Sequence, residues 1–464
     1  MTRGLLAGVL VWAVLLGIVA TLSLPVAALL AAGSILALLA MGDLGLLLAG
    51  VLLFNMIGEP YELAYASVSL GGLNLYANDV LLLVLAAAWT LKRLREGHVP
   101  ALPRDPISVL LLIYLAYGCF SLVRSLPLHG SAAFAAFRVH FFYGLLFFVT
   151  LPTLSDPRSR RRLFLAALIG ATWISLFGVL NAATGAHLGS RTSTHTYRYL
   201  SSLQALAIFF GLSLLIGVVW ARRRTLGSLL LGGLYLSGIL ISQARSIWLG
   251  ALVAMLTAVF GSLAWRRNLV RLALPVGAVL LVFVLIGGLT GRADLAQDVV
   301  TRAASFRDTS EDLTTVWRLF VWAEAARQLS ANPIFGLGLG KQFVYFDVVH
   351  NFWEDSRQLH NTYLEIAYPS GLIAAGLFIA FQVLVLWRTL KTARRCARAG
   401  PEAAGRAPRL LALAACQVCL AGAAFANVVG ASMVSTIYVW ILSAASVIET
   451  READALARAS EGPR

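Results

Sequence analysis

Side chains suited to proton transfer and hydrogen bonding gather just before an apolar run near residue 360. The sequence there is His360-Asn361-Thr362-Tyr363-Leu364-Glu365. An imidazole can take a proton near neutral pH, and a hydroxyl group must lose its proton when it attacks a carbon atom. A single histidine is more often a hydrogen-bonded structural residue. The position of His360 at the mouth of a hydrophobic span, beside Asn361, Tyr363 and Glu365, favours a role in a functional site.

Three arginines lie apart from the basic loops. They occupy the ends of apolar spans that face away from those loops. Arg191 and Arg198 occupy GSRTSTHTYRYLSS, directly before a span, and Arg245 occupies ISQARSIWLGA between two spans. A guanidinium at the membrane boundary is unfavourable unless it reaches the interface or has an anionic partner. One interpretation is interface anchoring, which is strongest for Arg198. The other is a phosphate clamp, because the planar guanidinium offers a fork of donors to phosphate oxygens.

A mixed apolar and polar segment and a glycine-rich turn precede the histidine. The segment TTVWRLFVWAEAARQL, which contains Arg318, has the spacing of a helix that lies along the membrane surface or covers a cavity. Pro333 ends this helix, and Gly336, Gly338 and Gly340 permit tight backbone geometry. Because no strand precedes the glycines, we exclude a dinucleotide site.

A metal site is the weaker alternative for the polar residues. Asp347, His350 and Glu354 have the i, i+3, i+7 spacing of one helix face, which suits a metal ion but equally a solvated face. The four cysteines lie in apolar spans or a basic loop, so we infer no disulfide framework and no zinc site. Packing is the better interpretation of Cys416-x-x-Cys419, which lies within an apolar span. We predict no metal and no other cofactor.

The chain that must position these residues is strongly hydrophobic. Of its 464 residues, 59% are hydrophobic and 13% are charged, and the mean hydropathy is +0.80. Soluble domains do not have this composition, and apolar runs of roughly 17–22 residues can cross a bilayer. The sequence predicts an all-α polytopic integral membrane protein with about 12–14 transmembrane helices. The predicted spans are 4–22, 25–41, 44–57, 77–91, 106–123, 140–154, 163–181, 201–220, 226–243, 247–264, 272–290, 367–388, 410–427 and 431–448.

The formal net charge of +15 reflects basic residues in short loops between the spans. This is the positive-inside pattern, so we predict that these loops and both termini face the cytoplasm. The segments 58–76, 124–139, 182–200 and 291–366 and the turn at Arg245 then face the other side. The basic clusters lack interleaved aromatic residues, which argues against nucleic acid and leaves membrane lipids as partners.

The hydropathy pattern divides the chain into four parts. An N-terminal transmembrane bundle covers 1–290, a polar catalytic segment 291–366, C-terminal transmembrane helices 367–448 and a short cytoplasmic tail 449–464. The polar segment carries ten of the 22 acidic residues against seven Lys and Arg residues. This charge asymmetry agrees with its placement on the outer side.

The order of these motifs resembles the O-antigen ligase and Wzy-type polymerase superfamily. The first part of the resemblance is Arg318 followed by Asn332-Pro333-Ile334-Phe335-Gly336-Leu337-Gly338-Leu339-Gly340, then His360-Asn361-Thr362-Tyr363-Leu364-Glu365 and Gly371-Leu372. Ser242-Gln243-Ala244-Arg245-Ser246 is similar to its SRG turn, and Arg191-Thr192-Ser193 to its external arginine loop. The Asn-Pro that the family has after that loop is replaced by Tyr197-Arg198-Tyr199, which leaves two candidates for the clamp, Arg191 and Arg198.

The resemblance implies a metal-independent, inverting glycosyltransferase of the GT-C type at the periplasmic face of a bacterial inner membrane. Its donor would be an undecaprenyl-pyrophosphate-linked glycan. His360 would be the base or would position the acceptor, while Arg191 and Arg245 would hold the pyrophosphate. The implied substrate-binding residues are Arg318, Arg198, Asn361, Tyr363, Glu365 and Gly338.

Several functions fit this resemblance. The leading hypothesis is an O-antigen ligase that uses a lipid A-core acceptor, and the alternative is a Wzy-type polymerase whose acceptor is a second lipid-linked glycan. A protein O-oligosaccharyltransferase fits less well, because that branch often carries a further C-terminal domain. A lipid-linked glycan transporter is disfavoured because the charges cluster at the outer ends of spans and the hydropathy pattern does not repeat.

Overall fold

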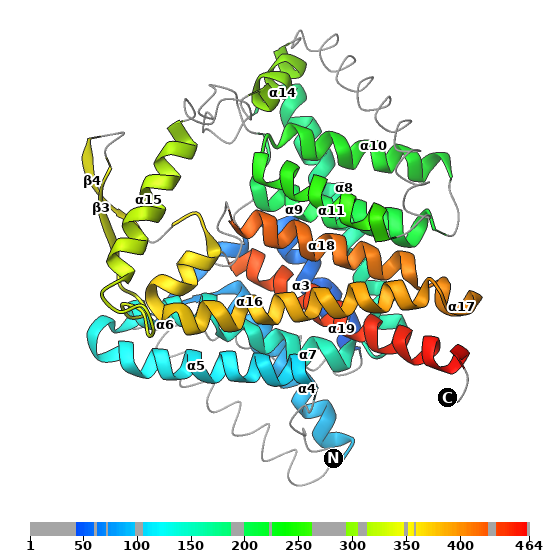
Figure 1. Cartoon of the computed structure of the whole chain (residues 1–464), viewed down its shortest axis with the longest axis horizontal. Coiled ribbons are helices and arrows are strands. Elements are labelled where there is room, and N and C mark those ends of the chain that lie inside the picture. The colour runs from blue at the N-terminus through cyan, green and yellow to red at the C-terminus, as the bar shows by residue number, and fades with distance from the viewer. Residues whose placement is uncertain are drawn as a thin grey trace.

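The computed structural model shows a helical bundle whose long apolar helices confirm the predicted fold class (Figure 1). Within the described residues, seven segments are long and apolar enough to cross a membrane, and three shorter apolar helices accompany them. The structure describes residues 43–59, 63–70, 73–97, 105–186, 199–221, 225–261, 294–304, 313–347, 351–356, 359–425 and 433–461. The predicted spans 4–22, 25–41 and 272–290 lie outside this part of the chain.

The first half of the described chain supplies most of the bundle. Its elements are α3 (Leu44–Gly58), η2 (Leu63–Tyr65), β1 (Ser67–Leu70), β2 (Leu73–Tyr76), α4 (Ala77–Arg95), α5 (Pro106–His129), α6 (Ser131–His140), η3 (Phe142–Gly144), α7 (Leu145–Thr153), α8 (Pro157–Thr184), α9 (Ser202–Leu214), η4 (Leu215–Val219), α10 (Leu226–Ile241) and α11 (Arg245–Gly261). The predicted span 140–154 belongs to a longer candidate membrane segment, Ser131–Thr153, which consists of α6, η3 and α7 in succession.

The second half contains the polar segment and the last three long helices. Its elements are α14 (Asp294–Ala304), α15 (Leu313–Leu329), β3 (Phe343–Asp347), β4 (Phe352–Ser356), α16 (Thr362–Cys396), α17 (Pro401–Ala404), α18 (Ala407–Phe425) and α19 (Met433–Glu461). Figure 1 shows α15 and the β3–β4 hairpin at one end of the bundle, and α17 and the C-terminal end at the other. The segment 449–464, expected as a separate tail, continues α19 as far as Glu461.

Side-chain caps determine where many helices begin. Asp105 and Asp156 accept backbone N–H groups at the starts of α5 and α8, and each is followed by proline at the first helical position. Ser201 and Gln204 form a reciprocal capping box at the start of α9. These residues satisfy amide groups that have no partner inside the helix, so the chain enters each apolar run at a defined residue.

Close helix packing holds the centre of the bundle. Trp440 of α19 is buried against Tyr114 of α5 and against Phe378 and Phe381 of α16, with ring centroids 5.4–6.3 Å apart. Aromatic pairs at these separations contribute beyond the area that they bury. Two elements on which the candidate site depends, α16 and α19, are therefore fixed to one another by their side chains.

The polar segment contains strands that we did not predict. β3 and β4 pair antiparallel, with Tyr345 opposite Glu354 and Asp347 opposite Phe352. The helical i, i+3, i+7 spacing assigned to Asp347, His350 and Glu354 is therefore wrong for the two described residues, and His350 lies outside the described residues. The aromatic and β-branched run Phe343–Asp347 alternates buried and exposed side chains, which is the period of a strand.

Candidate functional site

His360 lies at a tight turn directly before α16. Its φ of +50° is in the left-handed region, which few non-glycine residues adopt. Asn361 is the N-cap of α16, and its side-chain oxygen accepts hydrogen bonds from the N–H groups of Tyr363 (3.1 Å) and Leu364 (3.2 Å). Because the cap and the turn are adjacent, the position of the imidazole depends on the start of the helix.

Tyr363 and Glu365 fasten the same turn from within α16. The Tyr363 hydroxyl donates to the carbonyl oxygen of Ala421 on α18 at 3.1 Å. Glu365 is only 4% exposed, and its Oε1 accepts from the N–H of Leu359, the residue before His360, at 3.0 Å. The Glu365 Oε2 atom is buried and has no hydrogen-bond partner among the described residues. Oε1 of Glu365 therefore stabilises the turn, whereas Oε2 is available for a hydrogen bond to a ligand.

Helix α15 packs on His360, and the β3–β4 hairpin holds the residue of α15 that makes this contact. The rings of Trp317 and His360 meet edge to face with centroids 5.3 Å apart. The Trp317 indole N–H faces Asp347 Oδ2 at 3.0 Å and the Tyr345 hydroxyl at 3.1 Å. Tyr345 donates to Glu354 at 2.6 Å, and burial, followed by this carboxylate, raises the pKa of Tyr345. Tyr345 therefore stays protonated near neutral pH and holds the indole in place.

Arg245 begins α11 near the same part of α18. A Cβ atom on Gly422 of α18 would lie 3.4 Å from the Cα atom of Gly250, so α11 and α18 cross closely there. Arg245 is five residues before Gly250, which is about 7.5 Å along a helix axis. The neighbouring residue of α18, Ala421, is the one that Tyr363 binds. Gly250 of α11 and Tyr363 of α16 therefore contact neighbouring residues of α18, and Arg245 begins α11 about 7.5 Å from that contact.

The glycine-rich turn docks on a kink in α16. Gly336 and Gly371 have φ of +70° and +83°. A Cβ atom on Gly336 would lie 2.4 Å from the Gly371 nitrogen, and one on Gly371 would lie 2.0 Å from the Ile334 oxygen. The N–H of Gly338 donates to the Pro369 carbonyl oxygen at 2.9 Å. Only glycine fits such backbone contacts, so this turn sets the direction of α16 just beyond the His360 motif.

A polar cavity of about 240 Å³ lies between α6, the end of the glycine-rich turn and the first turns of α16. We call it the Glu365 cavity. Its wall combines apolar surface with side chains that can donate or accept hydrogen bonds. The members of this polar and aromatic set are Tyr76, Arg138, His140, Lys341, Glu365 and Tyr368.

Arg138 supplies a buried charge to this cavity that sequence reasoning missed. It is 6% exposed, and its Nη1 lies 3.0 Å from Asp79 Oδ2. The Tyr143 hydroxyl donates to the other oxygen of Asp79 at 2.7 Å, and the Tyr76 ring centre is 4.4 Å from the guanidinium carbon. A signal was present, because Arg138 lies in the segment 124–139 that we assign to the outer side. The ion pair and its hydrogen bond fix this wall and neutralise its charge.

The structure gathers four of the predicted site residues in one turn and places a fifth beside it. The turn holds His360, Asn361, Tyr363 and Glu365, and Arg318 follows Trp317 on the helix that packs on it. Arg191 and Arg198 lie outside the described residues. Among the residues that the structure does describe, no group of three His, Cys, Asp or Glu side chains could hold a metal ion.

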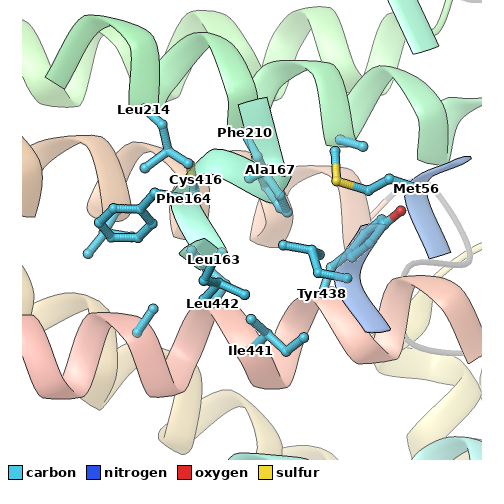
Figure 2. A pocket seen from close by; sticks show the side chains of 14 residues that line it. Met56, Leu163, Phe164, Ala167, Phe210, Leu214, Cys416, Tyr438, Ile441 and Leu442 are labelled. Atoms are coloured by element: carbon cyan, nitrogen blue, oxygen red, sulfur yellow. The ribbon is translucent and has the colours of Figure 1, made fainter. Parts of the chain in front are cut away.

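A second cavity has the wrong chemistry for this role. It is a hollow of about 50 Å³ between α3, α8, α9, α18 and α19, and Figure 2 shows that side chains such as Met56, Phe164, Phe210 and Leu442 point into it. Its described lining contains no charged group. Polar substrates need hydrogen-bonding partners when they leave water, so this hollow belongs to the packing of the bundle.

The fold and the site together define a polytopic helical membrane protein with a polar site at one end of its bundle. Residues 230–379 match the family model Wzy_C, described as O-antigen ligase. This match runs from α10 into α16 and confirms the resemblance to the O-antigen ligase and Wzy-type polymerase superfamily. It supports an enzyme that acts on a lipid-linked glycan and an acceptor. The comparison with curated proteins gave no match.

Proposed function

We propose that this protein is an O-antigen ligase. It transfers an undecaprenyl-pyrophosphate-linked glycan to a lipid A-core acceptor at the periplasmic face of the bacterial inner membrane, with inversion and without a metal. The observation that carries this proposal is the family match over 230–379. That segment contains Arg245, Arg318, the glycine-rich turn and the whole His360 motif.

In the proposed mechanism the imidazole removes a proton from the acceptor, and the arginines stabilise the negative charge of the leaving group. The acceptor oxygen forms a bond with the anomeric carbon while the bond from that carbon to the pyrophosphate oxygen breaks. His360 takes the proton of the acceptor hydroxyl, and the leaving pyrophosphate keeps the electron pair. Arg245, with Arg191 or Arg198, stabilises the charge that develops on the pyrophosphate, and such stabilisation is strongest where water is excluded.

The other candidate residues support these groups. Arg318 contacts phosphate or holds the site through α15. Asn361 and Tyr363 hold His360 in position, since they fasten its turn to α16 and α18. Gly338 shapes the site through the kink of α16.

The test is transfer by the purified protein from a synthetic undecaprenyl-pyrophosphate glycan to lipid A-core in the presence of EDTA. We expect product from the wild type, and loss of product from His360→Ala and Arg245→Ala at an unchanged melting temperature. Arg327→Ala is the matched control, because this arginine of α15 is 73% exposed and pairs only with Glu324 among the described residues. Elongation of the donor glycan would instead identify a Wzy-type polymerase, which the family match equally covers. Movement of an intact donor across liposomes would identify a transporter and overturn the proposal.

A further inference from the structure

The Glu365 cavity contains one buried acceptor atom that the fold leaves unused. Glu365 is 4% exposed, and its Oε1 accepts from Leu359 N–H, whereas its Oε2 has no partner among the described residues. A buried acceptor without a hydrogen bond is unfavourable by an amount comparable to a lost hydrogen bond. Because Glu365 lines the cavity, a ligand with a hydroxyl group would satisfy this atom.

The charges around the cavity favour a hydroxyl-rich ligand over a phosphate. Arg138 is already neutralised by Asp79, which also accepts the Tyr143 hydroxyl. Lys341 adds one positive charge to the wall, and Glu365 adds a buried carboxyl group. A carboxyl group forms hydrogen bonds with hydroxyl groups whether or not it is ionised, but it supplies none of the positive charge that a phosphate requires. The pyrophosphate is therefore the less suitable occupant.

The rest of the wall is suited to the faces of a sugar ring. Tyr76, Phe343 and Tyr368 present aromatic surface, and the alanines of α6 leave room between them. Tyr368 is held in place because its hydroxyl donates to Gln328 of α15 at 2.7 Å. Mostly apolar walls with a few fixed polar groups are typical of small-molecule sites.

We propose that the Glu365 cavity binds the acceptor sugar, and that Glu365 Oε2 accepts a hydrogen bond from one of its hydroxyl groups. This inference rests on the proposed glycosyl transfer and adds where the acceptor lies. The lining of the cavity includes Leu359 and Glu365 from the turn that carries His360. An acceptor held there borders the turn that carries His360 at Leu359 and Glu365, and Glu365 positions it without taking part in proton transfer.

Glu365→Gln tests the roles of the two carboxyl oxygen atoms separately. Glutamine keeps an oxygen that accepts from Leu359 N–H, and replaces the free oxygen by an amide that only donates. We expect the KM for lipid A-core to rise by about twofold to tenfold, the range of one lost hydrogen bond. The KM for the undecaprenyl-pyrophosphate donor and the melting temperature stay unchanged.

A second variant tests the cavity without changing Glu365. Ala135→Leu fills space at the α6 wall, so it should also raise the acceptor KM, whereas Ser131→Leu on an exposed position of the same helix should not. If the wild type transfers glycan and both Glu365→Gln and Ala135→Leu keep the wild-type acceptor KM, the cavity is not the acceptor site and the proposed function stands. A rise in the donor KM alone would also overturn the inference. If the wild type consumes no donor with any acceptor, both proposals fall.

Discussion

Asn361 links the stability of α16 to the placement of His360. Its buried side chain accepts from two N–H groups of the first turn. Asn361→Ala removes this cap, and we expect a loss of about 1 kcal/mol of stability, together with a larger proportional loss of transfer activity. Thermal unfolding in detergent and the transfer assay measure the two effects. Asn361→Asp, which keeps the capping oxygen, should restore most of the stability, and an unchanged melting temperature of Asn361→Ala would contradict the prediction.

Glu59 gives the fold a dependence on pH. Its carboxylate lies just beyond α3 and accepts from the hydroxyl of Ser201 at 2.8 Å and from the amide of Gln204. Burial nevertheless raises its pKa above the ordinary value of 4.5. The folded state therefore binds the proton more tightly than the unfolded chain does, so this group favours folding at low pH, and its contribution falls as pH rises from 4.5 through the raised pKa.

Glu59→Gln should remove this part of the pH dependence. Glutamine keeps a side chain of the same shape without a titrating proton, so the variant should gain stability relative to the wild type as pH increases above about 4.5. Melting temperatures across a pH series in one detergent measure the difference. Parallel curves for the two proteins would show that Glu59 titrates normally in the fold.

Some residues of the site can be predicted from the sequence, and others cannot. The His360 motif is local, so its residue types and its position before an apolar run predict both the helix start and the site. Arg138 and Asp79 are 59 positions apart, and only the packing of α6 against the start of α4 brings them together. Hydropathy can place Arg138 on the outer side, but it cannot pair the two charges.

At the scale of elements, the kink in α16 depends on Gly371. Its φ is +83°, and a Cβ atom there would lie 2.0 Å from the Ile334 oxygen, so a larger residue requires movement of the glycine-rich turn. Gly371→Ala should lower the stability of the fold by at least about 2 kcal/mol and reduce glycan transfer. The strain of a left-handed alanine and the contact of its Cβ atom with the Ile334 oxygen both contribute to this loss. Gly376→Ala, in the same helix with nothing within 4 Å, should stabilise by up to about 1 kcal/mol. Equal melting temperatures for the two variants would refute this account of the kink.

Elements embedded in the membrane are predicted better than those beside it. Apolar runs of sufficient length form helices because the bilayer leaves backbone groups no other partner, and α8, α16 and α18 confirm this. The polar segment lacks that constraint. Phe343–Asp347 and Phe352–Ser356 form a hairpin whose period of two is clear from burial but is obscured in sequence by polar residues on both strands.

For the whole molecule, a buried charge network ties three helices together at the end opposite the His360 turn. Glu449 of α19 is 1% exposed and lies 2.9 Å from Arg409, 3.5 Å from Arg406 and 3.8 Å from Arg160. Glu449→Gln leaves Arg409 without its anion, while Arg160 and Arg406 keep Glu452, and we expect a loss of about 3 kcal/mol of stability. Arg458→Ala, which breaks an exposed pair with Asp454, should cost less than about 1 kcal/mol. Thermal unfolding that ranks the two variants in the reverse order would disprove the role of the network.

The same network bears on the orientation of the chain in the membrane. The basic starts of α8 and α18 meet the C-terminal part of α19 at one end, whereas α15 and the β3–β4 hairpin lie at the other (Figure 1). Basic residues concentrate on the cytoplasmic side of membrane proteins. The hairpin, the His360 turn and the Glu365 cavity are therefore predicted to face the periplasm.

Cysteine labelling in intact cells tests this orientation. Trp353 on β4 and Arg458 near the end of α19 are 71% and 69% exposed, so a cysteine at either position is open to reagents. The background is Cys119→Ser, because the other three natural cysteines are buried. A membrane-impermeant maleimide should label Trp353→Cys in spheroplasts and Arg458→Cys only after the membrane is opened. The reverse pattern would place the site in the cytoplasm, where the proposed transfer to lipid A-core at the periplasmic face could not occur.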